Sequence, residues 1–186
     1  MPKLNVIICS TRPGRVGLPI GQWFFERAKQ HGKLEVELVD LKEMALPIFD
    51  EPKHPRFQQY EHEHTKRWSA SVSSADAFVF VTPEYNFSSP PALVNAIDYL
   101  FREWQNKPAG LVSYGGVSGG LRSAQMTKLL LTAVKVMPLP EAVTIPSVGS
   151  LVENGTFKGG DNFDKAATGL LDELLRWANA LKVLRE

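Results

Sequence analysis

The chain has 186 residues, of which 44% are hydrophobic and 22% charged, with a formal net charge of +1. This composition is typical of a globular protein that buries its own core, and it excludes the strongly basic surface of a nucleic-acid or membrane-binding protein. The single cysteine, Cys9, rules out an intrachain disulfide and fits a reducing compartment. The N-terminus carries no pattern of a secretory signal, membrane span or lipidation site, so we expect a cytoplasmic protein.

Short runs rich in β-branched residues alternate with longer runs of helical spacing. The short runs predict strands at Leu4–Cys9, Leu34–Leu41, Ala77–Val81, Ala109–Tyr114 and Ala142–Val148. The longer runs predict helices at Val16–His31, Gln58–Ser74, Pro90 to about Trp104, Leu121 to about Val136, and from a cap at Asp161 or Asn162 onward. Proline and polar residues predict loops at Met44–Phe57 and Asn154–Gly160.

Buried strands joined by helices predict a doubly wound α/β sheet, and no repeat or linker divides the chain, so we expect one domain over residues 1–186. Five strands favour the flavodoxin-like three-layer sandwich, with a parallel sheet of order 2-1-3-4-5. Ligands of such sheets bind at the carboxyl ends of the strands, near the switch point between strands one and three.

The first of three polar loops at this edge, Ser10 to Gly17, follows strand one and leads into a helix. It combines hydroxyls, glycines and the guanidinium groups of Arg12 and Arg15. Backbone N–H groups at a helix N-terminus attract anions, and arginine binds phosphate through charge-assisted hydrogen bonds. The loop therefore either binds a phosphate group or simply caps the helix. It matches neither the P-loop pattern nor G-x-G-x-x-G.

The second and third loops follow strands three and four. Thr82 to Pro91 is aromatic and polar, so its backbone can meet the edge of a planar heterocycle, although its aromatics can also pack on the next helix. Ser113 to Gly120 is rich in glycine, which lets backbone approach a ligand closely. Arg122 opens the next helix, where the helix dipole disfavours a cation, so it serves a ligand, a subunit contact or only the solvent.

These segments resemble the signatures of the NADPH-dependent FMN reductase family, which includes azo-dye, quinone and chromate reductases. The similarity runs from Leu4 to about Val148 and lies in three sets of residues. They are Ser10-Thr11-Arg12, then Thr82-Pro83-Glu84-Tyr85-Asn86 with Asn95-Ala96-Ile97-Asp98, and Ser113-Tyr114-Gly115 with Gly119-Gly120-Leu121-Arg122. The resemblance implies a flavodoxin-like fold, noncovalent FMN, NADPH or NADH as co-substrate, and homodimers or homotetramers.

The resemblance places the flavin phosphate on the first loop and the isoalloxazine ring against the second and third. Together with the loop chemistry, it yields a set of candidate cofactor-binding residues. They are Ser10, Arg12, Arg15, Val16 and Gly17 in the first loop, Pro83, Glu84, Tyr85 and Asn86 in the second, and Ser113, Tyr114 and Gly115 in the third. Electrons then pass by ping-pong exchange from NAD(P)H to a quinone, azo compound, flavin or oxidised metal ion, with no catalytic side chain assigned.

The sequence departs from the family pattern at three positions. Cys9 stands where glycine often begins the first loop, and Val94 where lysine often precedes Asn-Ala. Arg15 occupies the place of a second hydroxyl, where it either replaces that phosphate donor or serves NADPH. For subunit contact we expect an apolar face on the helix from Pro91 to Trp104.

Other functions explain fewer of these features. A flavodoxin-type electron carrier or a flavin-bound redox sensor would share the fold and FMN without turning over NAD(P)H. A receiver-type signalling domain needs an acidic pair after strand one, where Ile8-Cys9-Ser10 stands. We expect no metal at His62-Glu63-His64, because two histidines at i and i+2 point to different sides of a helix.

Overall fold

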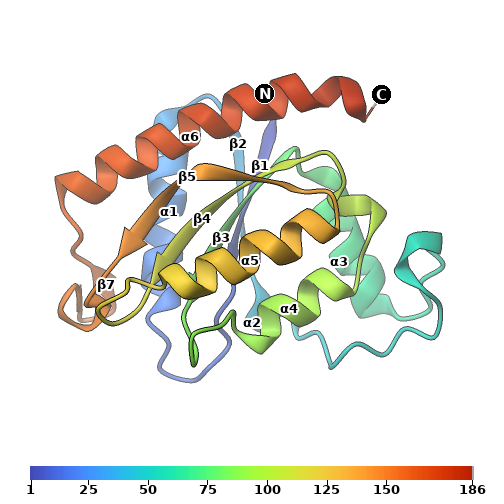
Figure 1. Ribbon diagram of the computed structural model, residues 1–186, viewed down its shortest axis with the longest axis horizontal. Coiled ribbons are helices and arrows are strands. Elements are labelled where there is room, and N and C mark those ends of the chain that lie inside the picture. Colours follow the sequence, from blue (N-terminus) through green and yellow to red (C-terminus); the bar gives the residue numbers. More distant parts are fainter. Residues whose placement is uncertain (186) are drawn as a thin grey trace.

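The computed structural model describes residues 1–185 and contains the predicted parallel sheet, with order β2-β1-β3-β4-β5 (Figure 1). Every neighbouring pair in this sheet is parallel, which confirms the flavodoxin-like topology. The strands are β1 (Lys3–Ile8), β2 (Glu35–Asp40), β3 (Ala77–Pro83), β4 (Pro108–Tyr114) and β5 (Met137–Ile145), and a small antiparallel pair is formed by β6 (Val152–Glu153) and β7 (Thr156–Phe157).

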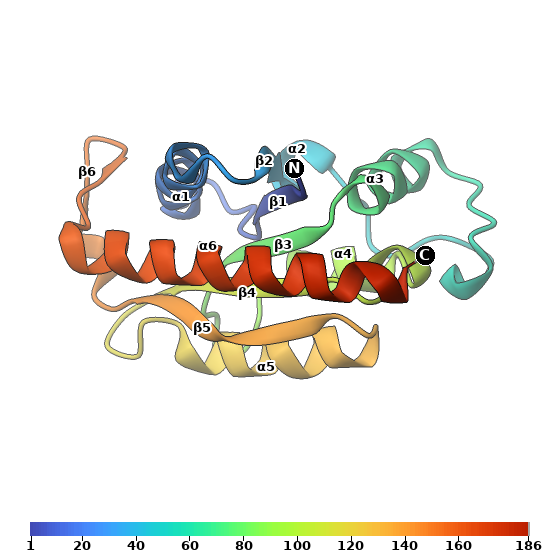
Figure 2. The same cartoon turned by 90° about the horizontal axis from the view of Figure 1, so that it is seen from above.

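Helices cover both faces of the sheet (Figure 2). The α-helices are α1 (Gly17–His31), α2 (Leu41–Met44), α3 (Glu63–Ser74), α4 (Pro91–Asp98), α5 (Leu121–Ala133) and α6 (Asp161–Leu181). Short 3-10 turns lie at Pro55–Phe57, Arg102–Trp104, Val148–Ser150 and Lys182–Leu184.

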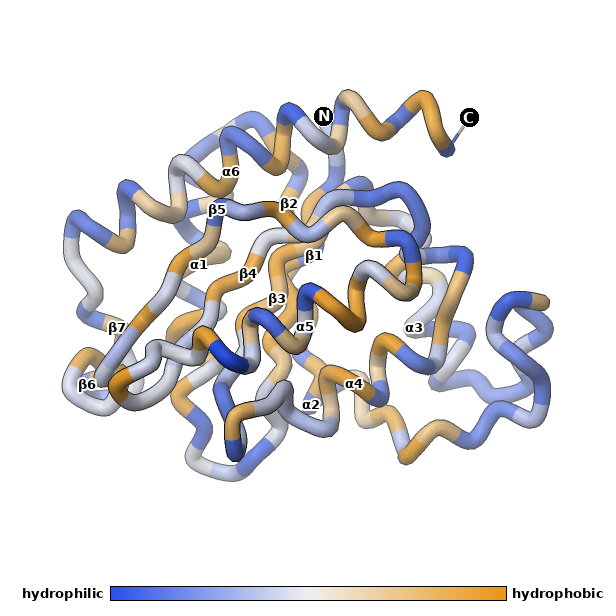
Figure 3. The backbone as a smooth tube through the Cα atoms, viewed as in Figure 1, coloured by the Kyte–Doolittle hydropathy of each residue, from blue (hydrophilic) through white to orange (hydrophobic). Residues whose placement is uncertain are grey.

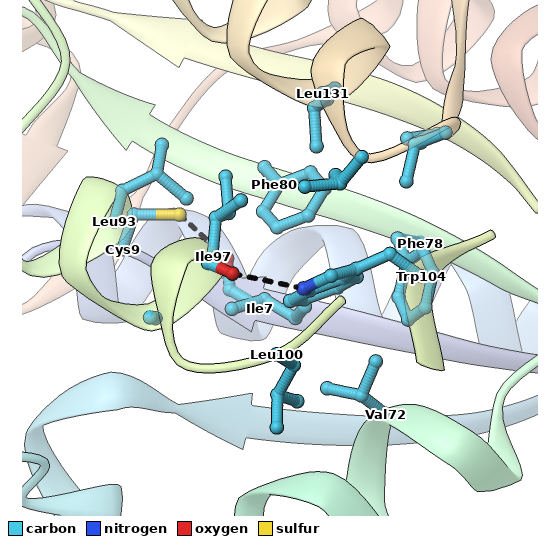
Figure 4. Packing of buried hydrophobic residues seen from close by; sticks show 14 of the residues in the cluster. Ile7, Cys9, Val72, Phe78, Phe80, Leu93, Ile97, Leu100, Trp104 and Leu131 are labelled. Carbon is cyan, nitrogen blue, oxygen red and sulfur yellow. Dashed lines mark hydrogen bonds between the residues drawn. The ribbon is translucent and has the colours of Figure 1, made fainter. Parts of the chain in front are cut away.

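Two hydrophobic cores result from the alternation of side chains along the strands, and the central strands form a continuous hydrophobic band (Figure 3). In β1, Leu4 and Val6 pack with α1 and α6 on one face. Ile7 and the following Cys9 pack with α3, α4 and α5 on the other. Figure 4 shows Trp104 within this second core, where its indole N–H donates to the carbonyl of Ile97 at 3.2 Å.

Several element boundaries differ from the prediction. Helix α4 ends at Asp98 rather than near Trp104, because the chain folds back there and buries Trp104. The helix begins at Pro91, one residue later than predicted, with Pro90 as its cap, and the hydroxyl of Ser89 bonds to Thr127 of α5 at 2.8 Å. Strand β5 begins five residues earlier than expected and contains two prolines, which the outer strand of a sheet tolerates.

The expected helix over Gln58–Ser74 begins only at Glu63. The two N–H groups before it, those of Glu61 and His62, donate to the buried carboxylate of Glu51 at 2.9 and 3.0 Å. Because His62 lies before the helix in extended conformation, its ring stacks on that of His64 rather than pointing away. Likewise, the cap of α6 is Gly160 rather than Asp161 or Asn162.

Candidate functional site

The three polar loops leave the sheet at the same edge, because they follow the neighbouring parallel strands β1, β3 and β4. Hydrogen bonds continue the strand pairing into the loops. Cys9 N donates to Val81 O at 3.0 Å, and Glu84 N donates to Tyr114 O at 3.3 Å. The sheet register therefore brings the predicted loops together at the carboxyl ends of the central strands.

The first loop is fixed to the outer strand through Arg15. Its guanidinium forms a bidentate ion pair with Asp40 at the end of β2, with Nη1 2.6 Å from Oδ1, and it also donates to the carbonyl of Ser10. The pair is well shielded, since the side chain of Arg15 is 8% exposed and that of Asp40 13%. The side chain of Arg12, by contrast, is exposed. Of the two arginines, Arg12 is thus the one whose charge faces the solvent.

Two buried hydroxyl groups meet beneath the first turn of α1. The side-chain oxygens of Ser10 and Tyr114 have no hydrogen-bond partner in the described chain, and their residues are 1% and 3% exposed. A Cβ at Gly17 would overlap both oxygens, so glycine is required at the first residue of this helix. Burial raises the pKa of the Tyr114 phenol, which keeps its proton available for donation.

The second loop is a tight hairpin. The backbones of Tyr85 and Ser88 exchange two hydrogen bonds of 3.0 Å, and the residues between them, Asn86 and Phe87, have φ values of 49° and 66°. Two consecutive left-handed residues characterise a type I′ turn, which asparagine tolerates well and phenylalanine rarely adopts. Phe87 is nevertheless 68% exposed, so this strained turn presents an aromatic ring at the rim of the site.

Glu84 connects the second loop to the third. Its Oε2 accepts from Ser118 Oγ and from the backbone N–H of Arg122, both at 3.0 Å, and its Oε1 accepts from Arg122 Nη1 at 2.9 Å. Although burial opposes ionisation, the hydrogen bonds from Arg122 and Ser118 lower the pKa of Glu84 below its ordinary value. The Arg122 guanidinium also stacks on Phe87, 4.2 Å from the ring centroid.

The third loop is held by its own backbone and by the end of β5. Gly115 N donates to Ile145 O at 3.2 Å, and Ser147 N donates to Gly116 O at 2.8 Å. At Gly120, φ is +81° and a Cβ would collide with the backbone of Tyr114. The glycine-rich segment is therefore an ordered turn with close backbone packing, rather than a loose connection.

The predicted site residues fall into three groups. Ser10, Val16 and Gly17 lie around the start of α1. The remaining two groups lie in the second and third loops, which the Glu84 contacts hold together. The hydroxyl of Tyr114, which the resemblance placed near the ring system, lies beside Gly17 at the start of α1.

Sequence reasoning missed two partners of the site, Asp40 and Ser118. Asp40 and Arg15 are 25 residues apart, and no local pattern pairs them. Ser118 lies within the predicted glycine-rich turn, but its bond to Glu84 is visible only once the sheet register is known. The Asn86-Phe87 turn had a partial signal, since asparagine favours positive φ.

The residues around Gly17 suit an organic phosphate. Buried hydroxyls without partners are costly unless a ligand or water satisfies them, and the N-terminus of α1 supplies backbone donors for an anion. Ser10 and the exposed Arg12 add a neutral and a cationic donor. FMN carries a phosphate of this kind together with a planar ring, and the adjoining second and third loops offer ordered backbone for the ring.

Fold and site together define a flavodoxin-like α/β protein with a candidate anion-binding loop at the switch point of its sheet. A model of the NADPH-dependent FMN reductase family matches residues 2–149, and the chain belongs to this family. It is accordingly an oxidoreductase that uses FMN with NAD(P)H as co-substrate.

Individual relatives agree with this assignment. The chain is 40% identical over 148 residues to an NAD(P)H-dependent FMN reductase of Schizosaccharomyces pombe, covering 78% of this chain and 74% of the relative. It is 31% identical to an NAD(P)H-dependent FMN reductase of Nectria sp, covering 99% and 97%. The solved structure of FerB, a flavoenzyme NAD(P)H:(acceptor) oxidoreductase from Paracoccus denitrificans, has the same fold, with TM-score 0.75, 22% identity and coverage of 97% and 98%.

Proposed function

We propose that this chain binds FMN at the three loops as a single domain and reduces small acceptors by ping-pong exchange. Ser10, Arg12 and the N-terminal backbone of α1 at Val16 and Gly17 hold the phosphate. Pro83, Glu84, Tyr85 and Asn86 line the isoalloxazine ring from one side, with Ser113 and Gly115 from the other. Arg15 acts indirectly, because its ion pair with Asp40 fixes the shape of the phosphate loop.

The chemistry follows from this arrangement. Bound FMN would accept hydride from NAD(P)H and pass the electrons to a second molecule. The side chains position the two reactants in turn, so that NAD(P)+ leaves before the acceptor enters the same space. Backbone N–H groups of the second and third loops stabilise negative charge that develops at the ring edge.

Relatives indicate which acceptors to test. A Bacillus protein that is 28% identical is named an NADPH azoreductase, and a Pseudomonas putida protein that is 31% identical is named a quinone reductase. We accordingly propose quinones and azo compounds as acceptors, with free flavins and oxidised metal ions as further candidates.

The observation that carries this proposal is the pair of buried, unpartnered hydroxyls of Ser10 and Tyr114 at the N-terminus of α1. The test is an absorbance scan of the FMN-loaded protein during anaerobic addition of NADPH. The expected result is bleaching of the flavin absorption that a quinone reverses, and steady-state kinetics should give parallel double-reciprocal plots. A flavin that stays oxidised with both NADPH and NADH would instead identify a carrier or redox sensor.

We further propose that the protein is cytoplasmic and acts as a homodimer or homotetramer. Leu93, Ala96 and Ile97 of α4 are buried and Val94 is half-buried, so only part of the expected apolar face on Pro91–Trp104 is exposed. Exposed apolar residues lie instead on α5, at Leu121, Met126 and Leu129, the last of which is 71% exposed. No helix among residues 1–185 is long and apolar enough to cross a membrane.

Light scattering coupled to size-exclusion chromatography tests the oligomer. For wild-type protein we expect a mass at least twice the chain's 20.7 kDa. The Leu129→Glu variant should have a lower mass. Val183→Glu is the matched control, because Val183 is 70% exposed near the C-terminus, away from α5. A wild-type protein of monomeric mass would contradict the proposal.

A further inference from the structure

Tyr114 reaches the phosphate loop from beneath, although it belongs to a different strand. It is the last residue of β4, and its hydroxyl lies beside Gly17 at the start of α1, next to the side-chain oxygen of Ser10. Its ring is part of the hydrophobic core between the sheet, α1 and α6. The phenol is therefore anchored by packing, and only its oxygen faces polar surroundings.

The hydroxyl of Ser10 has one proton and two lone pairs. When it donates that proton to an anion at the N-terminus of α1, its lone pairs remain to accept a hydrogen bond. Tyr114 is the adjacent donor, its hydroxyl has no partner within residues 1–185, and its raised pKa keeps it protonated. Arg15 cannot fill this role, because its Nη atoms point to Asp40 and to the carbonyl of Ser10.

We propose that Tyr114 is a positioning residue for the flavin phosphate: its hydroxyl donates to Ser10 Oγ, which orients the Ser10 proton toward the phosphate. This inference rests on the proposed binding of FMN at the first loop. It replaces contact with the ring, which the sequence implied for Tyr114, by a role at the opposite end of the cofactor. Hydrogen bonds that are linked in series polarise one another. The bond from Tyr114 to Ser10 therefore strengthens the bond that Ser10 donates to the phosphate.

The arrangement also accounts for the glycine at the first position of α1. Any side chain at Gly17 would occupy the space in which the two hydroxyls approach each other. A strand-end tyrosine, a loop serine and a helix-start glycine thus form one unit from three separate segments of the chain. Each of these residues is needed for the hydroxyl pair to form.

The test compares FMN with riboflavin, which lacks the phosphate, by fluorescence titration of flavin-free protein. Wild-type protein is expected to bind FMN more tightly than riboflavin. Tyr114→Phe removes only the hydroxyl, and it should weaken FMN binding about tenfold, the effect of one hydrogen bond, while riboflavin binding stays the same. Tyr60→Phe is the matched control, because its phenol bonds to Glu103 at 2.8 Å and belongs to none of the three loops.

A double-mutant cycle distinguishes orientation of Ser10 from direct contact with the phosphate. In a Ser10→Ala background, Tyr114→Phe should have no further effect on FMN affinity. Fully additive effects, or an unchanged ratio of FMN to riboflavin affinity in Tyr114→Phe, would overturn the inference. A wild-type protein that binds both flavins equally would instead refute the proposed phosphate site itself.

Discussion

The carboxylate of Glu84 accepts two hydrogen bonds from Arg122, one from the backbone nitrogen at 3.0 Å and one from Nη1 at 2.9 Å. Through this contact, the loop after β3 is fastened to the first turn of α5. The same arginine lies over the exposed ring of Phe87, so one residue pair sets the position of both the backbone and the aromatic rim of the second loop.

Loss of the Glu84 carboxylate should loosen two loops at once. We expect Glu84→Ala to weaken FMN binding roughly tenfold, since removing the acceptor of three hydrogen bonds costs on the order of 1–3 kcal/mol. Glu84→Gln keeps the size of the side chain, and its FMN affinity should lie between those of Glu84→Ala and wild type. Flavin fluorescence titration measures both, and Glu173→Ala, which breaks an exposed ion pair with Arg176 on α6, should leave the affinity unchanged.

Gly17→Ala should abolish FMN binding or reduce it severely, because the new Cβ overlaps the hydroxyls of Ser10 and Tyr114. Gly169→Ala is the matched control, since Gly169 also lies in an α-helix and its Cβ would meet no atom within 4 Å. There, alanine should raise the free energy of unfolding by up to about 1 kcal/mol. Equal flavin affinity in the two variants would show that the space beside Gly17 is not needed for the cofactor.

Breaking the Arg15–Asp40 ion pair should lower the free energy of unfolding more than breaking an exposed ion pair does. Asp40→Asn leaves a shielded guanidinium without its counter-charge and is expected to lower the free energy of unfolding by about 1–3 kcal/mol. Glu63→Gln, which removes the exposed partner of Lys66, should leave the free energy of unfolding almost unchanged, because water and salt screen this pair. Urea unfolding of flavin-free protein measures both, and equal losses would mean that the loop is not held through Asp40.

Acid should release the segment before α3. Burial disfavours the charged form of Glu51, but the N–H groups of Glu61 and His62 hold its pKa below the ordinary 4.5. A carboxylate with a lowered folded-state pKa contributes stability above that ordinary value and loses it as the pH falls further. The free energy of unfolding, measured between pH 7 and 3, should therefore be lower for Glu51→Gln than for wild type at neutral pH, and the two values should converge in acid. A difference between the two proteins that stays constant down to pH 3 would contradict this assignment.

The sequence indicated the sheet order and the three site loops, because both depend on patterns that are local in the chain. The parallel pairing of the strands is then enough to place the loops side by side, as the bond from Glu84 N to Tyr114 O illustrates. Contacts between distant residues, such as Arg15 with Asp40 and Tyr114 with Gly17, had no such signal. Strand β5 was placed too late in the chain because Pro138 and Pro140 weaken the pattern of a strand.

Those two prolines have a consequence for how the protein behaves at high concentration. They lie on β5, the outermost strand on one side of the sheet, and remove N–H groups that an incoming strand would need. The opposite margin, β2, carries the carboxylates of Glu35, Glu37 and Asp40. Both margins thus resist templated strand addition, the first step toward fibrils.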